Sequence, residues 1–262
     1  MGLVGIKLGV VATVLALLWL GENWIPFFAE FPGGLREKLR HDARNLLFGI
    51  VNAAVSGLLL AGCLAFVADW AASRGAGLVR LPHWPFWLQT LVALVLFDFW
   101  MYVWHRANHA VPLLWRFHRL HHGDSELDAT TGLRFHPGEI LLSGIARMLV
   151  VPLLGMSVWD LVLYESILLP VVVFHHSNVR LPRFLDYGLL ALIVTPAMHR
   201  VHHSRWRPET DSNYASILPC WDVLLGTFRL RSDAHTIRPG LETWAEPAWQ
   251  TTWETRNEPT HS

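Results

Sequence analysis

Residues 85–109, PFWLQTLVALVLFDFWMYVWHRANH, join an apolar run to a pair of histidines. The first 20 of these residues carry one charge, Asp98, and about 20 apolar residues are enough to cross a bilayer. His105 and His109 are four residues apart, so they lie on the same face of a helix. The stretch predicts a membrane-spanning helix that presents two imidazoles at one end.

Other apolar runs lie on both sides of this stretch. Residues 8–20 are uncharged and, together with residues 1–7, predict an anchor helix, since no small-residue cleavage site follows them. Residues 46–70 form the clearest span, and a further run covers residues 148–174. The chain is 52% hydrophobic and 16% charged with mean hydropathy +0.31, which excludes a disordered chain and disfavours a cytosolic enzyme.

The run over residues 148–174 is too short for two crossings. Its 27 residues give about 40 Å of helix, whereas each crossing needs a roughly 30 Å core. Pro152 and Gly155 interrupt it early, and Ser157 is placed to cap a second helix. We expect a hairpin that begins near Gly138 with a short, re-entrant first arm. Residues 187–198 are also too short to span and are expected at the interface or beneath the histidines.

The connections between spans differ in basic content. The connection over residues 21–45 carries four basic residues, and residues 71–84 carry two: Arg36, Lys38, Arg40 and Arg44 against Arg74 and Arg80. Because Lys and Arg concentrate on the cytoplasmic side, this predicts that residues 21–45 are cytoplasmic. The next span then delivers His105 to the cytoplasmic face.

The remaining composition excludes several classes of protein. Lys+Arg and Asp+Glu balance at 21 each, so no net field attracts nucleic acid. Cys63 and Cys220 fit no disulfide framework, zinc ribbon or redox motif. The 14 tryptophans are typical of a membrane–water interface, and the 15 histidines are the strongest clue to function.

Eleven histidines lie between residues 105 and 203, ten of them in short groups and His136 alone. These groups are H-x-x-x-H at 105–109, H-x-x-H-H at 118–122, the pair 175–176, and H-x-x-H-H at 199–203. Spacings of three and four residues place imidazoles on one helical face. Pro112 and Pro196 are placed to open the helices that carry the two H-x-x-H-H groups.

Nine imidazoles exceed the needs of one metal ion. A structural zinc takes four ligands and a catalytic zinc three, so nine suit two metal ions with four or five ligands each. Imidazole binds Zn, Cu, Fe and Ni alike, so ligand type does not choose the metal. The H-E-x-x-H motif of zinc proteases and the Glu-x-x-His repeat of soluble di-iron bundles are both absent from the sequence.

The ordered histidine groups resemble those of the sterol desaturase and fatty acid hydroxylase superfamily. Further similarity is carried by TTGLRFHPGE at 130–139, HSN at 176–178, TPAMHRVHH at 195–203, and NY at 213–214 with WDVLLGT at 221–227. The resemblance covers roughly residues 85–230. It implies an integral membrane, non-haem di-iron oxidoreductase, with two Fe ions and O₂ as co-substrate, that hydroxylates, desaturates or oxidatively cleaves a lipid.

The resemblance also implies the ligands by position. These are His105, His109, His118, His121, His122, His176, His199, His202 and His203. His175 and His136 are further candidates, either as ligands or as donors to a ligand. Ligating imidazoles usually donate their other N–H to a carboxylate or carbonyl, for which Asp98, Glu139 and Asp222 are the favoured acids. Asn213 is expected to position the last histidine group or to line the pocket.

One C–H oxidation by O₂ takes up two electrons from outside. The sequence contains no haem-attachment, flavin, nicotinamide or iron–sulfur motif. We therefore expect an external electron-donor protein of the cytochrome or ferredoxin type at the cytoplasmic face. Its docking residues would be basic, although the same residues also suit positive-inside anchoring: Arg116, Arg119, Arg205 and Arg207.

The sequence thus predicts an all-α integral membrane protein. It would have three to four transmembrane helices, a short hairpin and a cytoplasmic histidine-rich helical cap. Residues 1–84 are the expected anchor helices, 85–230 the catalytic domain and 231–262 a polar tail, where Trp244, Trp249 and Trp253 suggest an amphipathic cap. The partners would be the bilayer and a lipid substrate. Hydroxylation is the first choice of reaction, and desaturation is the second.

Two other classes of function remain open at this point. A histidine-lined membrane metal transporter would place the histidines at mid-depth along a pore. A zinc-dependent membrane hydrolase would need a general base and an open zinc position, and it would work without O₂.

Overall fold

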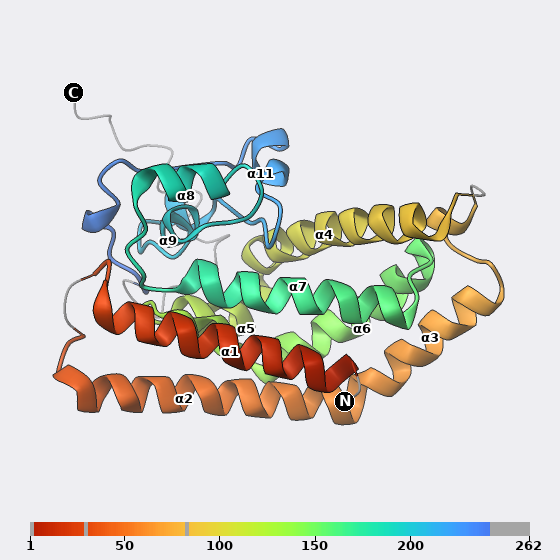
Figure 1. The fold of residues 1–262 in the computed structure, drawn as a ribbon, viewed down its shortest axis with the longest axis horizontal. Coiled ribbons are helices and arrows are strands. Elements are labelled where there is room, and N and C mark those ends of the chain that lie inside the picture. The colour runs from red at the N-terminus through yellow and green to blue at the C-terminus, as the bar shows by residue number, and fades with distance from the viewer. Residues whose placement is uncertain (1–2, 29–30, 82–83, 242–262) are drawn as a thin grey trace.

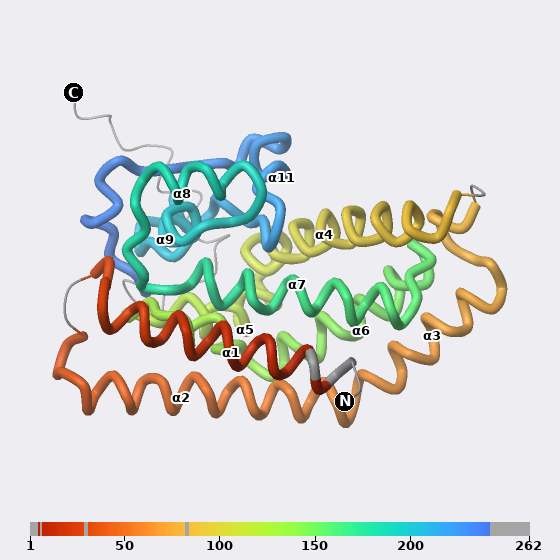
Figure 2. The backbone as a smooth tube through the Cα atoms, in the orientation of Figure 1, coloured from red at the N-terminus to blue at the C-terminus, as the bar shows by residue number. Residues whose placement is uncertain are grey.

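The computed structural model describes residues 3–28, 31–81 and 84–241, which form a helical bundle (Figures 1 and 2). In these ranges the only β-pairing consists of two isolated bridges, Pro26 with Val179 and Ser204 with Pro239. The all-α fold is therefore confirmed. The tryptophans expected to form a C-terminal cap lie outside the described residues.

Eight elements make up the body of the bundle, and short elements lie between them or after them in the chain. The body contains α1 (Leu3–Trp24), α2 (Gly34–Val55), the π-helical turn η1 (Ser56–Leu60), α3 (Ala61–Ser73), α4 (Phe86–Ala110), α5 (Pro112–His122), α6 (Pro137–Leu154) and α7 (Val158–His176). The short elements are η2 (Leu78–Arg80), η3 (Ala129–Leu133), α8 (Arg183–Leu189), α9 (Pro196–His202), α10 (Arg207–Thr210), α11 (Cys220–Leu224) and η4 (Ala234–Thr236).

Four of the described helical stretches are long and apolar enough to cross a membrane. They are Gly34–Arg80, which joins α2, η1 and α3, and the helices α4, α6 and α7. Their outward residues are apolar, as lipid contact requires: Leu58 is 84% exposed and Leu149 is 74% exposed. The chain is an integral membrane protein with the expected number of spans.

The stretch from α2 to α3 bends at its π-helical turn (Figure 1). Its 47 residues would extend about 70 Å as a straight helix, more than twice a hydrocarbon core of about 30 Å. The first turns of α2 bury polar side chains, among them Lys38, His41 and Asp42. The apolar span expected over residues 46–70 is helical throughout, whereas the first part of α2 packs against η3.

The hairpin expected near Gly138 is confirmed, but the expectation of a short first arm is wrong. Helix α6 begins at Pro137 and has 18 residues, against 19 in α7. Its first eleven residues precede the apolar run and are also helical, and Pro152 is accommodated inside the helix. The break falls at Gly155, whose φ of 84° ends α6, and Ser157 caps α7 as expected.

Small residues allow the spans to approach closely. Ala68 of α3 and Ala93 of α4 are fully buried in a core that also holds Phe97 and Tyr164, whose rings meet edge to face at 4.9 Å. Membrane helices associate by such close packing, because lipid is as apolar as the side chains. This core packs together the ends of α3, α4, α6 and α7 that lie away from the histidines.

The short elements from α8 onward gather over one end of the bundle (Figure 1), where α9 packs against α7 and Trp221 of α11 donates to Asp98 of α4. Both expectations for residues 187–198 are met in part. Tyr187 is exposed, whereas Val194 and Met198 are buried with Tyr102 and Tyr214. These elements bring the last histidine group onto the ends of the spans.

Replacing Gly77 with alanine should destabilise the bundle. Gly77 has φ 113°, and an added Cβ would lie 2.2 Å from the Cα of Gly155. Because a backbone atom cannot move aside, we expect a loss of about 2 kcal/mol or more, seen as a lower unfolding midpoint in detergent. The control Gly62→Ala, with nothing within 4 Å, should be neutral or stabilising; equal midpoints for both variants would contradict the contact.

Candidate metal centre

The structure brings together all nine histidines expected as ligands. They form two buried or half-buried groups, and within each group one nitrogen or more from every ring lies within 4.8 Å of the others. The first group has five members and the second has four: His105, His109, His118, His122 and His202, then His121, His176, His199 and His203. They come from α4, α5, α7 and α9, plus the residue after α9.

The first group is built where α4 and α5 meet. His105 and His109 lie one turn apart on α4, and the rings of His109 and His118 are 5.0 Å apart between centroids. His202 approaches from α9, with its Nε2 3.0 Å from the Nε2 of His105. The geometry gathers five nitrogens around one space.

The second group joins α5, α7 and α9. The Nε2 of His176 is 3.0 Å from the Nε2 of His121 and 3.0 Å from the Nε2 of His199. The Nε2 of His203 is 3.2 Å from that of His199. The two groups adjoin, because the rings of His122 and His203 stack at 4.5 Å.

Each H-x-x-H-H motif contributes to both groups. Successive helical residues point about 100° apart, so His121 and His122 face different spaces. His118 joins His122 in the first group, while His121 belongs to the second. In the other motif, His199 and His203 belong to the second group and His202 to the first.

Hydrogen bonds at Nδ1, on the side of the ring away from the shared space, fix the orientation of four of these rings. A carbonyl or carboxylate can only accept, so Nδ1 carries the proton and Nε2 keeps its lone pair for the shared space. The four bonds run from His105 to Tyr214 O (2.8 Å), from His202 to Ser212 O (2.6 Å), from His176 to Val172 O (2.7 Å), and from His118 to Glu139 Oε1 (2.9 Å).

Several buried ring nitrogens face the groups without a protein partner. Among the described residues, His118 Nε2 and His122 Nε2 have no hydrogen bond. Leaving a buried acceptor unpaired costs about 1–3 kcal/mol, so two such atoms beside seven other imidazoles indicate a ligand. The donor set fits two metal ions, with five and four imidazoles available to them.

Burial favours the neutral form of five of these imidazoles, and the neutral form is the one that binds metal. Burial, reinforced by neighbouring imidazoles, holds the pKa of His121, His122, His199 and His203 well below its usual range. Burial also lowers the pKa of His202, to about 3, although its bond to Ser212 O opposes the shift.

Glu139 lies where the sequence placed it, behind a ligand candidate. Its Oε1 accepts hydrogen bonds from His118 Nδ1 and from Asn108 Nδ2 at 3.1 Å. The carboxylate thereby fixes the orientation of the His118 ring and joins the first turn of α6 to α5.

Asp222 and Asn213 act on the backbone rather than on the rings. Asp222 accepts from the backbone N–H groups of Tyr214 and Ala215, both at 2.8 Å. Asn213, at φ 55°, donates from Nδ2 to Met198 O at 2.9 Å. Both residues support the segment that offers its carbonyls to His105 and His202.

The expectation that Asp98 contacts a ligating histidine is wrong. Its oxygens accept from Tyr164 Oη at 2.7 Å, Trp221 Nε1 at 2.8 Å and Leu218 N at 3.1 Å. The physical reason is distance along α4, since seven residues separate Asp98 from His105 and correspond to about 10 Å.

His136 and His175 lie outside both groups. His136 caps α6, and its Nδ1 accepts the Gly138 N–H at 2.9 Å. His175 is buried with its ring centroid 4.0 Å from that of His199, but no nitrogen of it joins the four-membered group. Neither position supports a place in the two ligand sets.

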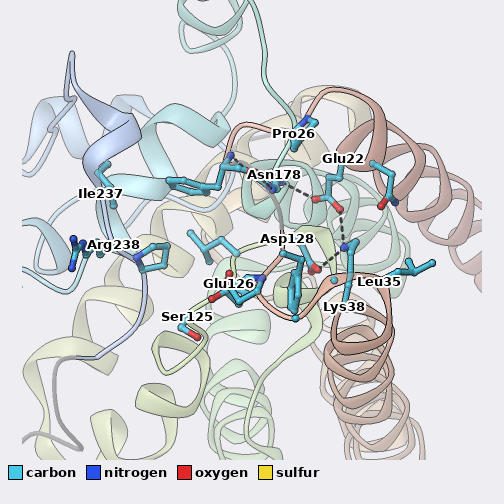
Figure 3. Close-up of a pocket in the computed structure, with 18 of the residues that line it drawn as sticks. Glu22, Pro26, Leu35, Lys38, Ser125, Glu126, Asp128, Asn178, Ile237 and Arg238 are labelled. Atoms are coloured by element: carbon cyan, nitrogen blue, oxygen red, sulfur yellow. Dashed lines mark hydrogen bonds and ion pairs between the residues drawn. The ribbon is translucent and has the colours of Figure 1, made fainter.

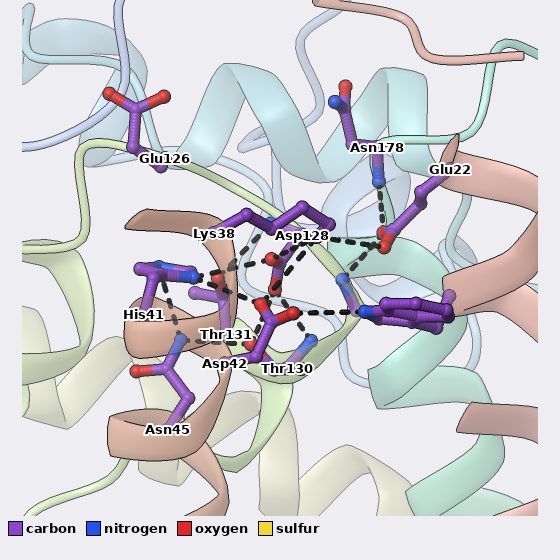
Figure 4. A network of polar contacts seen from close by, with 12 residues as sticks. Glu22, Lys38, His41, Asp42, Asn45, Glu126, Asp128, Thr130, Thr131 and Asn178 are labelled. Carbon is purple, nitrogen blue, oxygen red and sulfur yellow. Dashed lines mark hydrogen bonds and ion pairs between the residues drawn. The ribbon is translucent and has the colours of Figure 1, made fainter. Parts of the chain in front are cut away.

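Two features near the site were missed by sequence reasoning. Asp211 Oδ1 lies 3.4 Å from His109 Nδ1, although the sequence gave this acid no priority. A buried polar network on α2 includes His41, whose Nε2 is 2.8 Å from Asp124 Oδ1 (Figure 4). The only sequence signal for the network was a set of polar residues at helical spacing on the α2 segment.

Buried histidines at the ends of membrane helices define a membrane protein with a two-part imidazole centre that could hold metal ions. The profile of the Fatty acid hydroxylase family matches residues 90–227, more than half of the chain. The chain therefore belongs to the Fatty acid hydroxylase family, and the resemblance seen in the sequence is confirmed.

Individual relatives agree with this assignment. Ornithine lipid hydroxylase OlsE of Rhizobium tropici is 31% identical over 82% of this chain and 65% of its own length. Human alkylglycerol monooxygenase is 30% identical over 84% of this chain and 46% of its length. Human cholesterol 25-hydroxylase is 31% identical over 54% of this chain and 52% of its length. The chain thus spans about half to two thirds of these relatives, and no solved structure matches it significantly.

Acid should destabilise the metal-free protein. A histidine whose pKa is lowered by folding takes up its proton in the unfolded state first, so stability falls as pH drops below about 6.5. We expect the unfolding midpoint in detergent to be level from pH 8 to 7 and to fall from pH 7 to 5. The exposed-site variant His235→Gln should behave like the wild type, and a level midpoint down to pH 5 would contradict the burial of neutral imidazoles.

Replacing Glu139 with glutamine should weaken metal binding. The amide keeps an acceptor for His118 Nδ1 but removes the charge that raises the basicity of the ring, so we expect a 10–100-fold loss of affinity. Competition with a chelator, using Fe²⁺ or Zn²⁺ as the probe, measures it. The exposed control Glu37→Gln should bind like the wild type; equal affinity in Glu139→Gln would argue against its role.

Proposed function

We propose that this chain is an O₂-dependent lipid hydroxylase with a di-iron centre. The observation that carries the proposal is the pair of adjoining histidine groups, five and four, inside the region that matches the family. Two bound iron ions would supply O₂ activation and the oxidation of an unactivated C–H bond. The nine histidines would hold them, and His175 and His136 would not.

The protein residues supply orientation and a dry environment. Tyr214 O, Ser212 O, Val172 O and Glu139 each hold a ring in one orientation, so the Nε2 atoms need no rearrangement when metal binds. Tyr102, Val194 and Met198 form a buried apolar cluster beside the first group, which excludes water. Exclusion of water favours oxidation of the lipid over loss of oxidising equivalents to solvent.

The reaction needs a source of electrons. One hydroxylation consumes the lipid C–H, one O₂, two electrons and two protons, and yields the alcohol and one water. We infer a separate electron-donor protein of the cytochrome or ferredoxin type, since the sequence carries no redox motif of its own. Arg116 and Arg205 are exposed and suit an acidic donor surface, and the positive-inside tendency supports a cytoplasmic location for this face.

Hydroxylation is favoured over desaturation by the relatives. The three named above are called hydroxylases or a monooxygenase, and these names describe the addition of oxygen. The location of the histidines at helix ends, beneath short covering helices, disfavours a transporter with histidines along a pore. The substrate class we propose is a polar or neutral membrane lipid.

Replacing His202 with alanine should abolish turnover and reduce bound iron. His202 belongs to the first group, and its ring contacts the ring of His203 in the second. Its loss therefore removes a ligand and leaves a gap between the two groups. We expect about two irons per wild-type chain after anaerobic loading, and lipid products heavier by one oxygen only when O₂ is present. Metal analysis and lipid mass spectrometry measure both.

The matched control is His136→Asn, which retains a helix cap outside both groups. It should keep its iron and its activity. Full activity in a metal-free protein would refute the di-iron proposal, turnover without O₂ would indicate the zinc hydrolase, and metal flux into liposomes would indicate the transporter.

A further inference from the structure

A pocket of about 810 Å³ lies beside the second histidine group (Figure 3). Its walls come from the end of α1, the start of α2, the segment 125–128 after α5, and residues 237–239. Two lining residues follow ligand candidates closely: Asn178 is two residues beyond His176, and Arg205 is two beyond His203. Consecutive Cα atoms are about 3.8 Å apart, so each lies within about 8 Å of its histidine.

The charges that line the pocket balance. Three acids and three bases line it: Glu22, Glu126 and Asp128, with Lys38, Arg205 and Arg238. Lys38 Nζ lies 3.0 Å from Asp128 Oδ2, 3.5 Å from Asp42 Oδ1 and 4.0 Å from Glu22 Oε2, so it pairs mainly with Asp128 and only distantly with Glu22. Glu22 and the two arginines are then the charged groups available to a ligand, which favours a molecule that carries both signs of charge.

Glu22 has an unused acceptor in this wall. Its Oε1 accepts the backbone N–H groups of Ala129 and Asn178, both at 2.7 Å. Its Oε2 is buried, has no hydrogen-bond partner among the described residues, and lies 4.0 Å from Lys38 Nζ. A buried carboxylate oxygen without a donor is costly, and an ammonium group of a ligand would satisfy it.

The arginines occupy the opposite wall. Arg205 donates from Nε to Pro239 O at 2.8 Å and from its backbone N–H to Arg238 O at 2.9 Å. These bonds anchor the strip 237–239, and Figure 3 shows Arg238 across the pocket from Glu22 and Lys38. Guanidinium groups bind phosphate or carboxylate with paired hydrogen bonds.

Apolar residues complete the lining. Phe28, Phe31, Leu127 and Ile237 line the same pocket as the charged groups. A pocket lined by both apolar side chains and charged groups suits an amphipathic small molecule. Its size falls within the usual range of roughly 300–1,000 Å³ for ligand sites.

We propose that this pocket binds the headgroup of a zwitterionic lipid, with the cationic group at Glu22 and the anionic group at Arg205 and Arg238. The proposal rests on the proposed function, because it places the headgroup of the substrate beside the centre that oxidises the lipid. A sterol hydroxyl would leave both charged walls unpaired, and an anionic headgroup would leave Glu22 unpaired.

Binding of short-chain lipids to the full-length protein in detergent tests this inference. The probes are dihexanoyl phosphatidylethanolamine (zwitterionic), dihexanoyl phosphatidylglycerol (anionic), dihexanoylglycerol (uncharged) and free phosphoethanolamine. We expect the zwitterionic lipid to bind at least tenfold more tightly than the other two lipids. Free phosphoethanolamine should compete only at much higher concentration; tight binding of it alone would indicate a soluble ligand and overturn the lipid assignment.

Variants separate the two walls. Glu22→Gln keeps the Oε1 acceptor and should weaken the zwitterionic lipid about tenfold while leaving the anionic lipid unchanged. Arg238→Gln, at an exposed position, should weaken the binding of both the zwitterionic and the anionic lipid. The exposed controls Asp69→Asn and Arg74→Gln, at the far end of α3, should bind like the wild type.

Equal affinity for all three lipids, or wild-type binding by both pocket variants, would overturn the inference. Since lipid binding needs neither O₂ nor electrons, its failure is distinguishable from a failure of hydroxylation. A protein that hydroxylates lipids but shows no headgroup preference would refute the pocket assignment alone.

Discussion

Nine imidazoles can share one buried space only because α5 and α9 divide their side chains between two neighbouring groups. The 100° step between adjacent residues sends His121 and His122 to different groups, and His202 and His203 likewise. The spans supply the remaining rings from α4 and α7. If either short helix turned about its axis by one residue, both groups would lose nitrogens at once. The orientation of these two helices is therefore the constraint on which the site depends.

The His105 ring of α4 is supported by a chain of polar contacts that leads away from the site. Asp98 in α4 holds the Trp221 ring and the Leu218 backbone, and thus the start of α11. The neighbouring Asp222 holds the backbone of Tyr214, whose carbonyl holds the His105 ring. Asp98 is thus important to the centre without touching a histidine. An acid buried between apolar spans is retained because three donors satisfy it.

Local signals in the sequence predicted much of this architecture. Proline at the start of α5 and α9, the Ser157 cap and the three- and four-residue spacings all act within one helix, so they can be read without tertiary information. The contact between Glu139 and His118 joins α6 to α5, so local signals could only make this acid a candidate and could not show which ring it contacts. The length of α6 was underestimated because Pro152 was expected to interrupt it, whereas the helix accommodates this proline and ends at Gly155. His41 and Asp211 were missed because their partners lie on other elements, far away in the sequence.

Because α5 and α9 each serve both histidine groups, any free energy that stabilises the orientation of these two helices acts on both groups at once. The hydrogen bonds at Nδ1 already orient the rings, so this linkage acts through the local unfolding of the two short helices and not through rearrangement of single side chains. A ligand held by one group would therefore also protect the other group against local unfolding.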